Sequence, residues 1–334
     1  MVKKDFLGDN WLKYRPPETP VIFTTANGFN LAIKDESQNL TNTYKAKHGW
    51  MMGLDYLENH YPEPFIYYLG STGNAAMADF AYADMLNEIL GKQKVTVVCF
   101  YPKHYDSKIL GPDSKGKTTT GSDIRKKLET YQSGKVLQVD FEEKYWFDNF
   151  ENNYTPCLDL MNENGFNVNK NNSKDITEGF NPTYKQVMEE FAKQIKKQYG
   201  KIPKTLAIVQ FGAGMLYDDT KLVIQENNLP IDIIAVSTGN INTIADKICD
   251  SSESWQESLE DLTNKGHTYA KNSGDRIYNI SEDEIKKGLQ ICSNLNIEAE
   301  ASGAASLGFL EKVNKIIKKN YDLIAVINTG NGIK

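Results

Sequence analysis

The chain has 334 residues, a formal net charge of −6 and a hydrophobic fraction of 40%. This length allows two domains or one large one, with ample apolar material for a core. The mildly acidic balance argues against nucleic acid or an anionic membrane as a partner, because either would require a concentrated basic face.

The cysteines and histidines give no sign of a metal or a disulfide framework. Cys99, Cys157, Cys249 and Cys292 lie far apart, and the four histidines lack metal-ligand spacing. The opening MVKKDFLGDNW contains no apolar signal segment, and no apolar run approaches the length of a membrane span. We therefore expect a cytoplasmic protein, without a metal, that binds or transforms a small molecule.

Short β-rich apolar runs alternate with amphipathic runs of helical length. Strands are predicted at Val95–Tyr101, Gly134–Asp140, Thr205–Phe211, Ile231–Ser237 and Asp322–Gly330. Helices are predicted at Ala75–Leu90, Ser122–Gln132, Thr183–Tyr199, Thr220–Asn227, Ser281–Leu295 and Ala304–Lys319. This alternation predicts βαβ units and largely parallel sheets. The polar stretches Tyr105–Gly121 and Tyr145–Asn181 are predicted to be long surface loops, the second also a candidate domain junction.

Ligands of doubly wound sheets bind at the carboxyl ends of the strands, so the loops that follow strands matter most. The first, NLTNTYKAKHGW (Asn39–Trp50), places Lys45 and Lys47 in a polar run where a lysine is ordinarily a surface charge. The second runs from a strand through Gly70-Ser71-Thr72-Gly73-Asn74 into an Ala-rich helix. Free N–H groups at such a helix start suit a carboxylate, although this loop alone favours a plainly capped helix.

Two further loops follow later strands. IVQFGAGMLYDD (Ile208–Asp219) has the strand, Gly-x-Gly turn and helix of a phosphate-binding loop, but it lacks the full signature of a P-loop or a dinucleotide fold. AVINTGNGIK (Ala325–Lys334) places the Thr329 hydroxyl at a strand end. An amine, an anion-binding helix start, a phosphate loop and a strand-end hydroxyl are together what pyridoxal phosphate requires.

The order of these elements resembles the fold type II pyridoxal-phosphate enzymes, the tryptophan synthase β-subunit superfamily. KDESQNLTNTYKAK is similar to that family's K-x-E-x-x-N-x-T-x-S-F-K-x-R pattern and places its Schiff-base lysine on Lys45. STGNAA resembles the S-S-G-N loop, FGAGML takes the place of the phosphate loop, and NTGNGIK resembles the T-G-x-G-x-K end of threonine synthases.

The resemblance implies a role for each motif. Lys45 would be the covalent anchor of pyridoxal 5'-phosphate and the base for the α-proton, and Lys47 would stay a surface or pocket-edge charge. The implied cofactor-binding residues are Lys45, Asn74, Gly212, Ala213, Gly214, Met215, Leu216 and Thr329. The implied residues for a small amino-acid substrate are Thr43, Ser71, Thr72, Gly73 and Asn74. Met215 and Leu216 are bulkier than the glycine and hydroxyl residues usual in this loop.

The resemblance also implies an architecture. It predicts an α/β protein with two doubly wound parallel-sheet domains, the active site in the cleft between them, and a homodimer. Residues 46–145 would form the smaller, mobile domain, and residues 1–45 plus 146–334 the larger, cofactor-binding domain.

The implied reaction is α-proton abstraction followed by β- or γ-elimination or replacement, of a threonine synthase-like kind. A phosphorylated substrate would require cations, for which Lys47, Lys103 and His104 are the candidates; the three arginines, Arg15, Arg125 and Arg276, are not placed by the sequence. An ammonia-lyase of the threonine or diaminopropionate type and a cysteine-synthase-like β-replacement are alternatives. A non-catalytic homologue acting as a binding partner is another, and a nucleotide- or phosphosugar-binding protein would leave the lysine motif unexplained.

Overall fold

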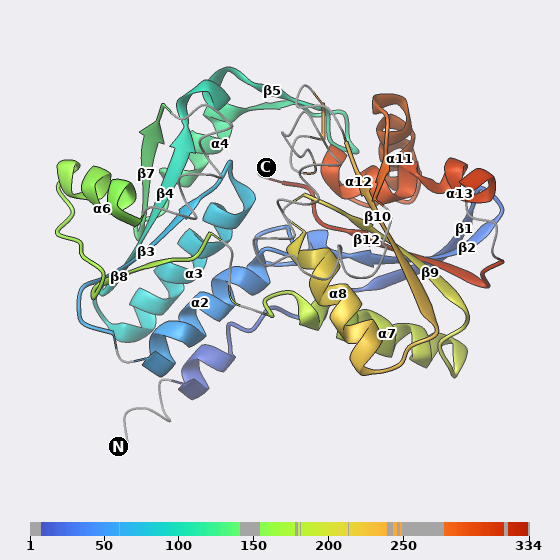
Figure 1. Ribbon diagram of the computed structural model, residues 1–334, viewed down its shortest axis with the longest axis horizontal. Helices are drawn as coiled ribbons and strands as arrows, with labels where there is room; N and C mark the ends of the chain where they lie inside the picture. The colour runs from blue at the N-terminus through green and yellow to red at the C-terminus, as the bar shows by residue number, and fades with distance from the viewer. Residues whose placement is uncertain are drawn as a thin grey trace.

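The computed structural model consists of two α/β halves, each built on its own sheet (Figure 1). It describes residues 8–59, 61–140, 154–177, 180, 182–212, 214–238, 243–245, 248, 277–316 and 320–332. Among these residues, no helix combines the length and the apolar character that crossing a lipid bilayer requires.

The larger half contains a six-stranded sheet in the order β1-β2-β12-β9-β10-β11. Its strands are β1 (Val21–Ala26), β2 (Phe29–Asp35), β9 (Thr205–Gln210), β10 (Ile231–Ser237), β11 (Ile277–Asn279) and β12 (Leu323–Asn328). All neighbours are parallel except β1 and β2, which form an antiparallel hairpin at the edge. The carboxyl ends of β2, β12 and β9 therefore lie side by side.

Helices cover both faces of this sheet (Figure 1). The helices are α7 (Lys185–Tyr199) and α8 (Met215–Glu226) on one face, and α11 (Glu282–Asn294), α12 (Ala301–Gly308) and α13 (Leu310–Ile316) on the other. Successive strand residues alternate between the two cores: Leu206 and Ile208 pack against α11 and α12, whereas Ala207 and Val209 pack against α7 and α8. Burial on both faces explains why these strands are continuous apolar runs.

The smaller half contains a parallel sheet in the order β7-β4-β3-β8. Its elements are α2 (Ala46–Asn59), β3 (Phe65–Gly70), α3 (Asn74–Leu90), β4 (Val95–Pro102), the 3-10 helix η2 (Lys103–Ser107), α4 (Gly121–Leu128), β7 (Gly134–Val139), α6 (Tyr154–Glu163) and β8 (Ser173–Asp175). Phe65, Tyr67 and Leu69 face the core under α2 and α3, whereas Ile66 and Tyr68 face the core shared with Leu158 and Met161 of α6.

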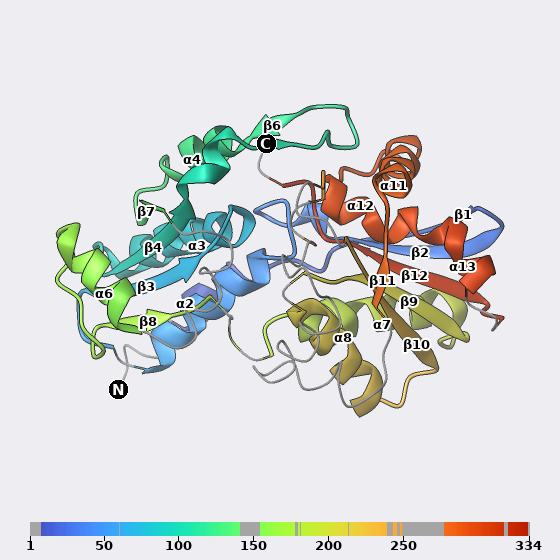
Figure 2. The ribbon, with the colours of Figure 1, turned by 45° about the horizontal axis from the view of Figure 1, so that its top comes forward.

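A thin hairpin from the smaller half reaches the larger half. Its strands, β5 (Ile109–Leu110) and β6 (Thr119–Thr120), extend from α4 toward α12 (Figure 2). At its tip the Ser114 N–H donates to the Ala299 carbonyl at 2.8 Å, and the Ser114 hydroxyl donates to the Ile297 carbonyl at 2.9 Å. The hairpin thus ties the two halves together beside the start of α12.

The α/β class with two sheets is confirmed, and several expected boundaries differ. The stretch Tyr145–Asn181, expected to be a loop, contains α6 and β8 in its described part. Because β8 pairs with β3, the smaller half extends past the expected boundary at residue 145. Tyr105–Gly121 contains η2 and the β5–β6 hairpin. The helix expected at 304–319 is two helices, α12 and α13, and α8 begins five residues before the expected Thr220 because Gly214 starts it in a left-handed conformation (φ 83°).

Candidate active site

The lysine loop and the loop after β12 are joined through their backbones. Thr43 forms an antiparallel bridge with Gly330, and the Tyr44 N–H donates to the Thr329 carbonyl at 3.1 Å. Gly330 adopts φ 136°, and a Cβ there would lie 2.3 Å from the Asn42 carbonyl oxygen. Only glycine permits this approach. The structure therefore brings Lys45 to the loop that carries Thr329, which itself is buried.

The Lys45 amine lies against two tyrosines. Its Nζ donates a hydrogen bond to the Tyr184 hydroxyl at 2.9 Å and lies 5.0 Å from the ring centroid of Tyr44 and 4.9 Å from that of Tyr184. The Thr43 hydroxyl accepts from the Lys45 N–H at 3.1 Å, which fixes the backbone at this turn. Burial lowers the pKa of Lys45, but Tyr184 and Tyr44 more than offset that effect and raise it above its ordinary value.

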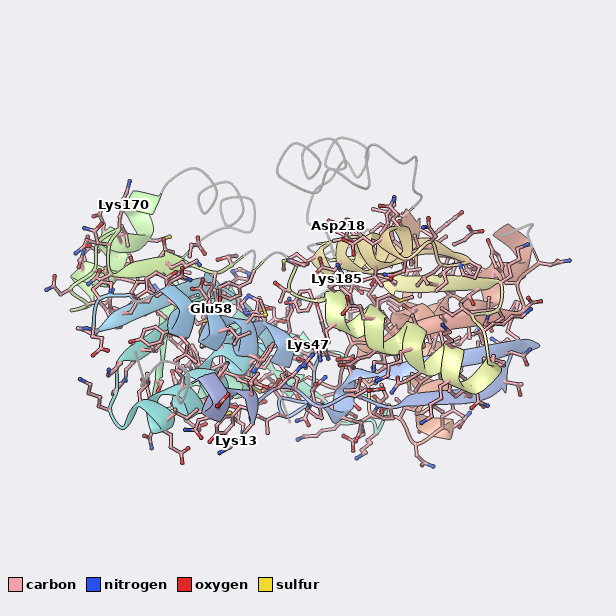
Figure 3. The ribbon with its side chains drawn as sticks, turned by 90° about the horizontal axis from the view of Figure 1, so that it is seen from below. Lys13, Lys47, Glu58, Lys170, Lys185 and Asp218 are labelled. Carbon is pink, nitrogen blue, oxygen red and sulfur yellow. The ribbon has the colours of Figure 1, made fainter. Side chains whose placement is uncertain are left out.

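Lys47 occupies a different environment, and the expectation of a surface charge is wrong. It is 1% exposed, and its Nζ lies 2.9 Å from Oε2 of Glu36, in the 3-10 turn η1 (Glu36–Gln38). Glu36 also lies 4.0 Å from Lys34 Nζ and accepts from the Thr19 hydroxyl. Burial raises the pKa of Glu36, but Lys47 and Lys34 lower it by more than burial raises it. The pKa of this carboxyl therefore lies below its usual range. Lys47 lies where the two halves meet (Figure 3).

Asn74, at the start of α3 in the smaller half, is linked through Glu300 to the loop after β12. Its Nδ2 donates to Glu300 Oε1 at 3.0 Å, and the Glu300 N–H donates to the Gly330 carbonyl at 3.0 Å. Asn74 Oδ1 is buried and has no hydrogen-bond partner within the described residues. Ser71 Oγ accepts from the Gly73 N–H at 3.1 Å, so Ser71–Gly73 form a tight turn at the start of α3.

The glycine loop after β9 ends in an uncapped helix start. Gly214 precedes α8 in a left-handed conformation, and no side chain caps the helix there. Leu216 is buried, and Met215 packs against the same core, so both bulky side chains point away from the helix end. The first N–H groups of such a helix have no partner within the helix and form a ready anion site. Gly212 lies in this loop, and Ala213 lies outside the described residues.

Tyr184 connects this helix to Lys45. It directly precedes α7, is fully buried, and its backbone N–H donates to Asp219 Oδ2 of α8 at 2.6 Å. Burial raises the pKa of Asp219 to about 6, because the bond from Tyr184 only partly compensates the lost hydration. Tyr184 thus links Lys45 to α8, through its hydroxyl on one side and its backbone N–H on the other.

The sequence matches the family model of pyridoxal-phosphate-dependent enzymes over residues 16–330. The chain belongs to this family. Its cofactor is pyridoxal 5'-phosphate. No curated protein matches the enzyme's sequence significantly.

Solved structures with the same fold cover nearly the whole enzyme. A pyridoxal 5'-phosphate-dependent aspartate racemase is 14% identical, with a TM-score of 0.66 over 100% of this chain and 95% of that one. Serine racemase from Dictyostelium discoideum is 17% identical, with a TM-score of 0.66 over 99% and 97%. The L-serine ammonia-lyase from Rhizomucor miehei is 16% identical, with a TM-score of 0.63 over 94% of each chain. At these identities the likeness establishes fold type II and not the reaction.

The donor set of the enzyme fits its cofactor. The cofactor requires a primary amine, a hydrogen-bond partner for its ring hydroxyl and N–H groups for its phosphate. Lys45 would supply the amine, the unpaired Oδ1 of Asn74 is a buried acceptor without a donor, and the start of α8 would supply the N–H groups. The described residues contain no group of three or more His, Cys, Asp or Glu side chains that could hold a metal ion.

Several contacts of this region are not predictable from the sequence. Tyr184 is far from Lys45 in sequence, and Glu300 is far from Asn74, so only the fold brings each pair together. His48 and Asp79 form a second hidden pair, with Nδ1 and Oδ1 2.6 Å apart, while His48 Nε2 lies 3.1 Å from the Ile176 carbonyl oxygen. The acidic Glu300 before the small-residue run ASGAAS indicates a helix start, because a negative charge is favourable at a helix N-terminus.

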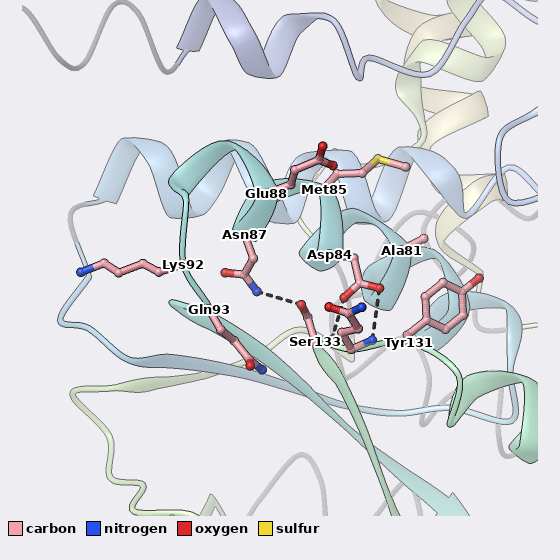
Figure 4. Close-up of a pocket in the computed structure, with 10 residues that line it drawn as sticks. Ala81, Asp84, Met85, Asn87, Glu88, Lys92, Gln93, Tyr131 and Ser133 are labelled. Atoms are coloured by element: carbon pink, nitrogen blue, oxygen red, sulfur yellow. Dashed lines mark hydrogen bonds between the residues drawn. The ribbon is translucent and has the colours of Figure 1, made fainter.

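A separate cavity of about 620 Å³ lies on the smaller half, away from these residues (Figure 4). Asp84 accepts from the backbone N–H groups of Gln132 and Ser133, and Asn87 donates to the Ser133 hydroxyl at 2.8 Å. These bonds attach the turn before β7 to α3. These polar lining residues therefore stabilise the fold, and the cavity is lined by none of the candidate site residues.

Proposed function

We propose that the enzyme acts on a small amino acid, with Lys45 as covalent anchor of the cofactor and as the base for the α-proton. The observation that carries this proposal is the position of Lys45, a half-buried residue where the loops after β2 and β12 meet, with Asn74 linked to the loop after β12 through Glu300. When bound, the cofactor withdraws electrons from the α-carbon of the substrate.

The remaining site residues have positioning roles in this proposal. The turn Ser71-Thr72-Gly73-Asn74 holds the substrate carboxylate with its N–H groups, and Asn74 also orients the cofactor ring. The N–H groups of Gly212–Leu216 hold the phosphate, Thr329 faces the ring nitrogen, and Thr43 fixes the Lys45 backbone. A neutral hydroxyl at the ring nitrogen does not enforce its protonation, which favours elimination or replacement of a β- or γ-substituent.

The candidate cations of the chain bear on the identity of the leaving group. A threonine synthase-like reaction on a phosphorylated substrate requires free cations. Lys47 is bound to Glu36, Lys103 pairs with Asp140, and Arg125 pairs with Asp106 and Glu129. Arg15 lies over the Trp50 ring at 5.6 Å, and Arg276 lies outside the described residues. The buried ion pair of Lys47 removes one of the three candidate cations, which favours the ammonia-lyase alternative, on an unphosphorylated hydroxy or diamino acid.

Spectroscopy and mass spectrometry test the anchor. Purified protein given pyridoxal phosphate should absorb in the visible, and borohydride should fix the cofactor to the peptide that contains Lys45. Lys45→Ala should lose this linkage, whereas Lys103→Ala, which changes an exposed lysine, should retain it. Fixation to another lysine, or no fixation in the unchanged protein, would contradict the proposal.

A substrate panel tests the reaction. Serine, threonine, diaminopropionate, O-acetylserine and O-phosphohomoserine should be supplied separately, and ammonia, keto acid and phosphate release measured. Release of ammonia and keto acid from a hydroxy or diamino acid supports the lyase. Phosphate release with formation of threonine supports the synthase, and racemisation alone would contradict both.

A further inference from the structure

We propose that Tyr184, together with Tyr44, forms an aromatic cage that holds the protonated form of Lys45 and so makes this lysine a stronger base. The inference deepens the proposed function, since it rests on Lys45 being the residue that takes the α-proton. It assigns a catalytic contact to Tyr184, which lies outside the lysine motif, and to Tyr44, which stands at the aromatic position of that motif.

The geometry is that of a cation held between a hydroxyl oxygen and an aromatic ring. Tyr184 Oη accepts the hydrogen bond from Lys45 Nζ at 2.9 Å, and the centroids of both rings lie about as far from Nζ as a cation–π contact requires. The rings of Tyr44 and Tyr184 also contact each other, with centroids 4.7 Å apart and planes tilted by 57°. A positive charge at Nζ therefore meets the hydroxyl oxygen of Tyr184 and the electron-rich ring of Tyr44.

The cage is rigidly built, which distinguishes it from a chance contact of a flexible lysine. Tyr184 is fully buried, and its backbone is fixed by Asp219. Tyr44 is fixed by its backbone bond to the Thr329 carbonyl. The cage thus spans the two loops that meet at Lys45 and the start of α7.

Tyr184 serves as a neutral acceptor and not as a relay. Burial raises the pKa of its phenol, and the positive charge of Lys45 compensates only in part. When the free Lys45 amine takes the α-proton, the C–H bond breaks, an N–H bond forms, and the electron pair stays on the substrate. The new ammonium then donates to Tyr184 Oη, while the phenol keeps its own proton.

Three other titratable groups interact with the residues of the cage or with one another. Asp79 of α3 is buried and acts electrostatically on Tyr184, and Lys45 acts in turn on Asp79. His48 of α2 lies within hydrogen-bond distance of Asp79, and Asp219 of α8 contacts the backbone of Tyr184. Among these side chains, Tyr184 forms the hydrogen bond with Lys45 Nζ, whereas the described hydrogen bonds of Asp79, His48 and Asp219 are to other groups.

Competitive acylation of the cofactor-free protein tests the cage without any catalysis. Trace acetic anhydride labels only neutral amines, and peptide mass spectrometry across a pH series gives the titration midpoint of each lysine. In the unchanged protein the midpoint of Lys45 should lie above that of the exposed Lys127, which serves as internal reference. A midpoint at or below that of Lys127 would overturn the proposal, even if no variant folds.

The decisive variant is Tyr184→Phe, which keeps the ring and removes the acceptor. Loss of a charge-assisted hydrogen bond should increase the neutral fraction of Lys45, and its labelling rate below the midpoint, about tenfold or more. Tyr82→Phe removes another buried hydroxyl, one without a hydrogen-bond partner in the described residues, and should leave Lys45 unchanged.

An unchanged Lys45 midpoint in Tyr184→Phe, or an equal shift in Tyr82→Phe, would refute the cage. Cofactor fixation is measured in parallel on the unchanged protein. If the cofactor is not fixed to Lys45, the proposed function fails, while the labelling result still decides the cage.

Discussion

Lys45 and Lys47 stand two positions apart, and their surroundings give them opposite properties. Lys45 is partly exposed and meets phenol groups, which can accept a bond from its ammonium without cancelling its charge. Lys47 is buried against a carboxylate, so its proton is committed to an ion pair. The difference arises because the first residue precedes α2 and the second lies in its first turn, on the side facing η1.

Replacing Lys47 tests whether its charge supports the fold. Lys47→Met should lower the free energy of unfolding by about 3 kcal/mol, because it leaves the buried Glu36 with one cation fewer. Urea unfolding measures the change. Lys13→Met, at an exposed lysine, is the matched control and should change little. The double change Glu36→Gln with Lys47→Met should recover part of the loss, and a single variant as stable as the control would contradict burial of the pair.

Asp219 provides a test that depends on pH. The folded protein holds its proton up to about pH 6, whereas an exposed aspartate releases it near pH 4. Wild-type stability contributed by this group is therefore present at low pH and is lost as the pH rises through 4 to 6. Asp219→Asn keeps an acceptor for the Tyr184 N–H and should be more stable than wild type at pH 8, by roughly 1–2 kcal/mol. Thermal melts at pH 4 and pH 8 measure this gain, and an equal gain at both values would argue against it.

At the scale of elements, α12 lies so close to the loop after β12 that only glycine fits between them. A Cβ on Gly303 would lie 2.5 Å from the Gly330 carbonyl oxygen and 2.7 Å from Asn328 Oδ1. Asn328 in turn donates to Asp35 at 2.8 Å and to the Glu298 carbonyl. The position of Thr329 is thus set by helix packing as well as by its own strand.

Gly303→Ala should therefore disturb the site without touching the cofactor. We expect a loss of about 1–3 kcal/mol from overpacking, together with weaker cofactor binding, because the loop must move away from α12. Fluorescence titration with pyridoxal phosphate and urea unfolding measure the two effects. Gly8→Ala is a helical control with open space around it and should change neither. An unchanged affinity for pyridoxal phosphate in Gly303→Ala would contradict this prediction, because it would show that the added methyl group does not displace the loop after β12.

At the scale of the molecule, the proposed site is shared between the two halves, and side chains link the halves beside it. Asn74 and Glu300 connect α3 to α12, and the β5–β6 hairpin joins the smaller half to the residues just before α12. A ligand that contacts both halves should therefore stabilise them together.

Saturating pyridoxal phosphate should raise the melting temperature of the cofactor-free protein. At a concentration 100 times the dissociation constant, the gain is about 2.7 kcal/mol. Hydrogen exchange should slow at the starts of both α3 and α8, which belong to different halves. Protection confined to one half would contradict a shared site. Lys45→Ala, which lacks the anchor, should show a smaller shift.

Much of this architecture follows from the sequence, because buried parallel strands are unbroken apolar runs. The strand predicted at Ile231–Ser237 has the same bounds in the structure. β8 reads Ser-Lys-Asp and gives no such signal, since its place in the sheet depends on pairing with β3 and on the ion pair of Lys174 with Asp55. The buried state of Lys47 was hidden for a similar reason: its partner Glu36 lies eleven positions away across a turn.

The site was predictable only in its local parts. Lys45, Asn74 and Thr329 each follow a recognisable loop pattern, and their roles stay predictions. Tyr184 was not predictable, because nothing in the residues before α7 indicates that a tyrosine there meets a lysine 139 positions earlier. Contacts of this kind depend on how helices pack and not on local spacing.

The order of strands in the large sheet has a consequence for synthesis on the ribosome. β12, the last strand in the chain, lies between β2 and β9, and Asn328 bonds to Asp35 across 293 residues. At roughly 5–20 residues per second, β2 waits on the order of 15–60 s for its neighbour to be translated. The smaller sheet, whose last strand ends at Asp175, can assemble meanwhile. The nascent β1–β2 hairpin therefore exposes an unpaired edge for most of translation, which is the interval when a chaperone would protect it.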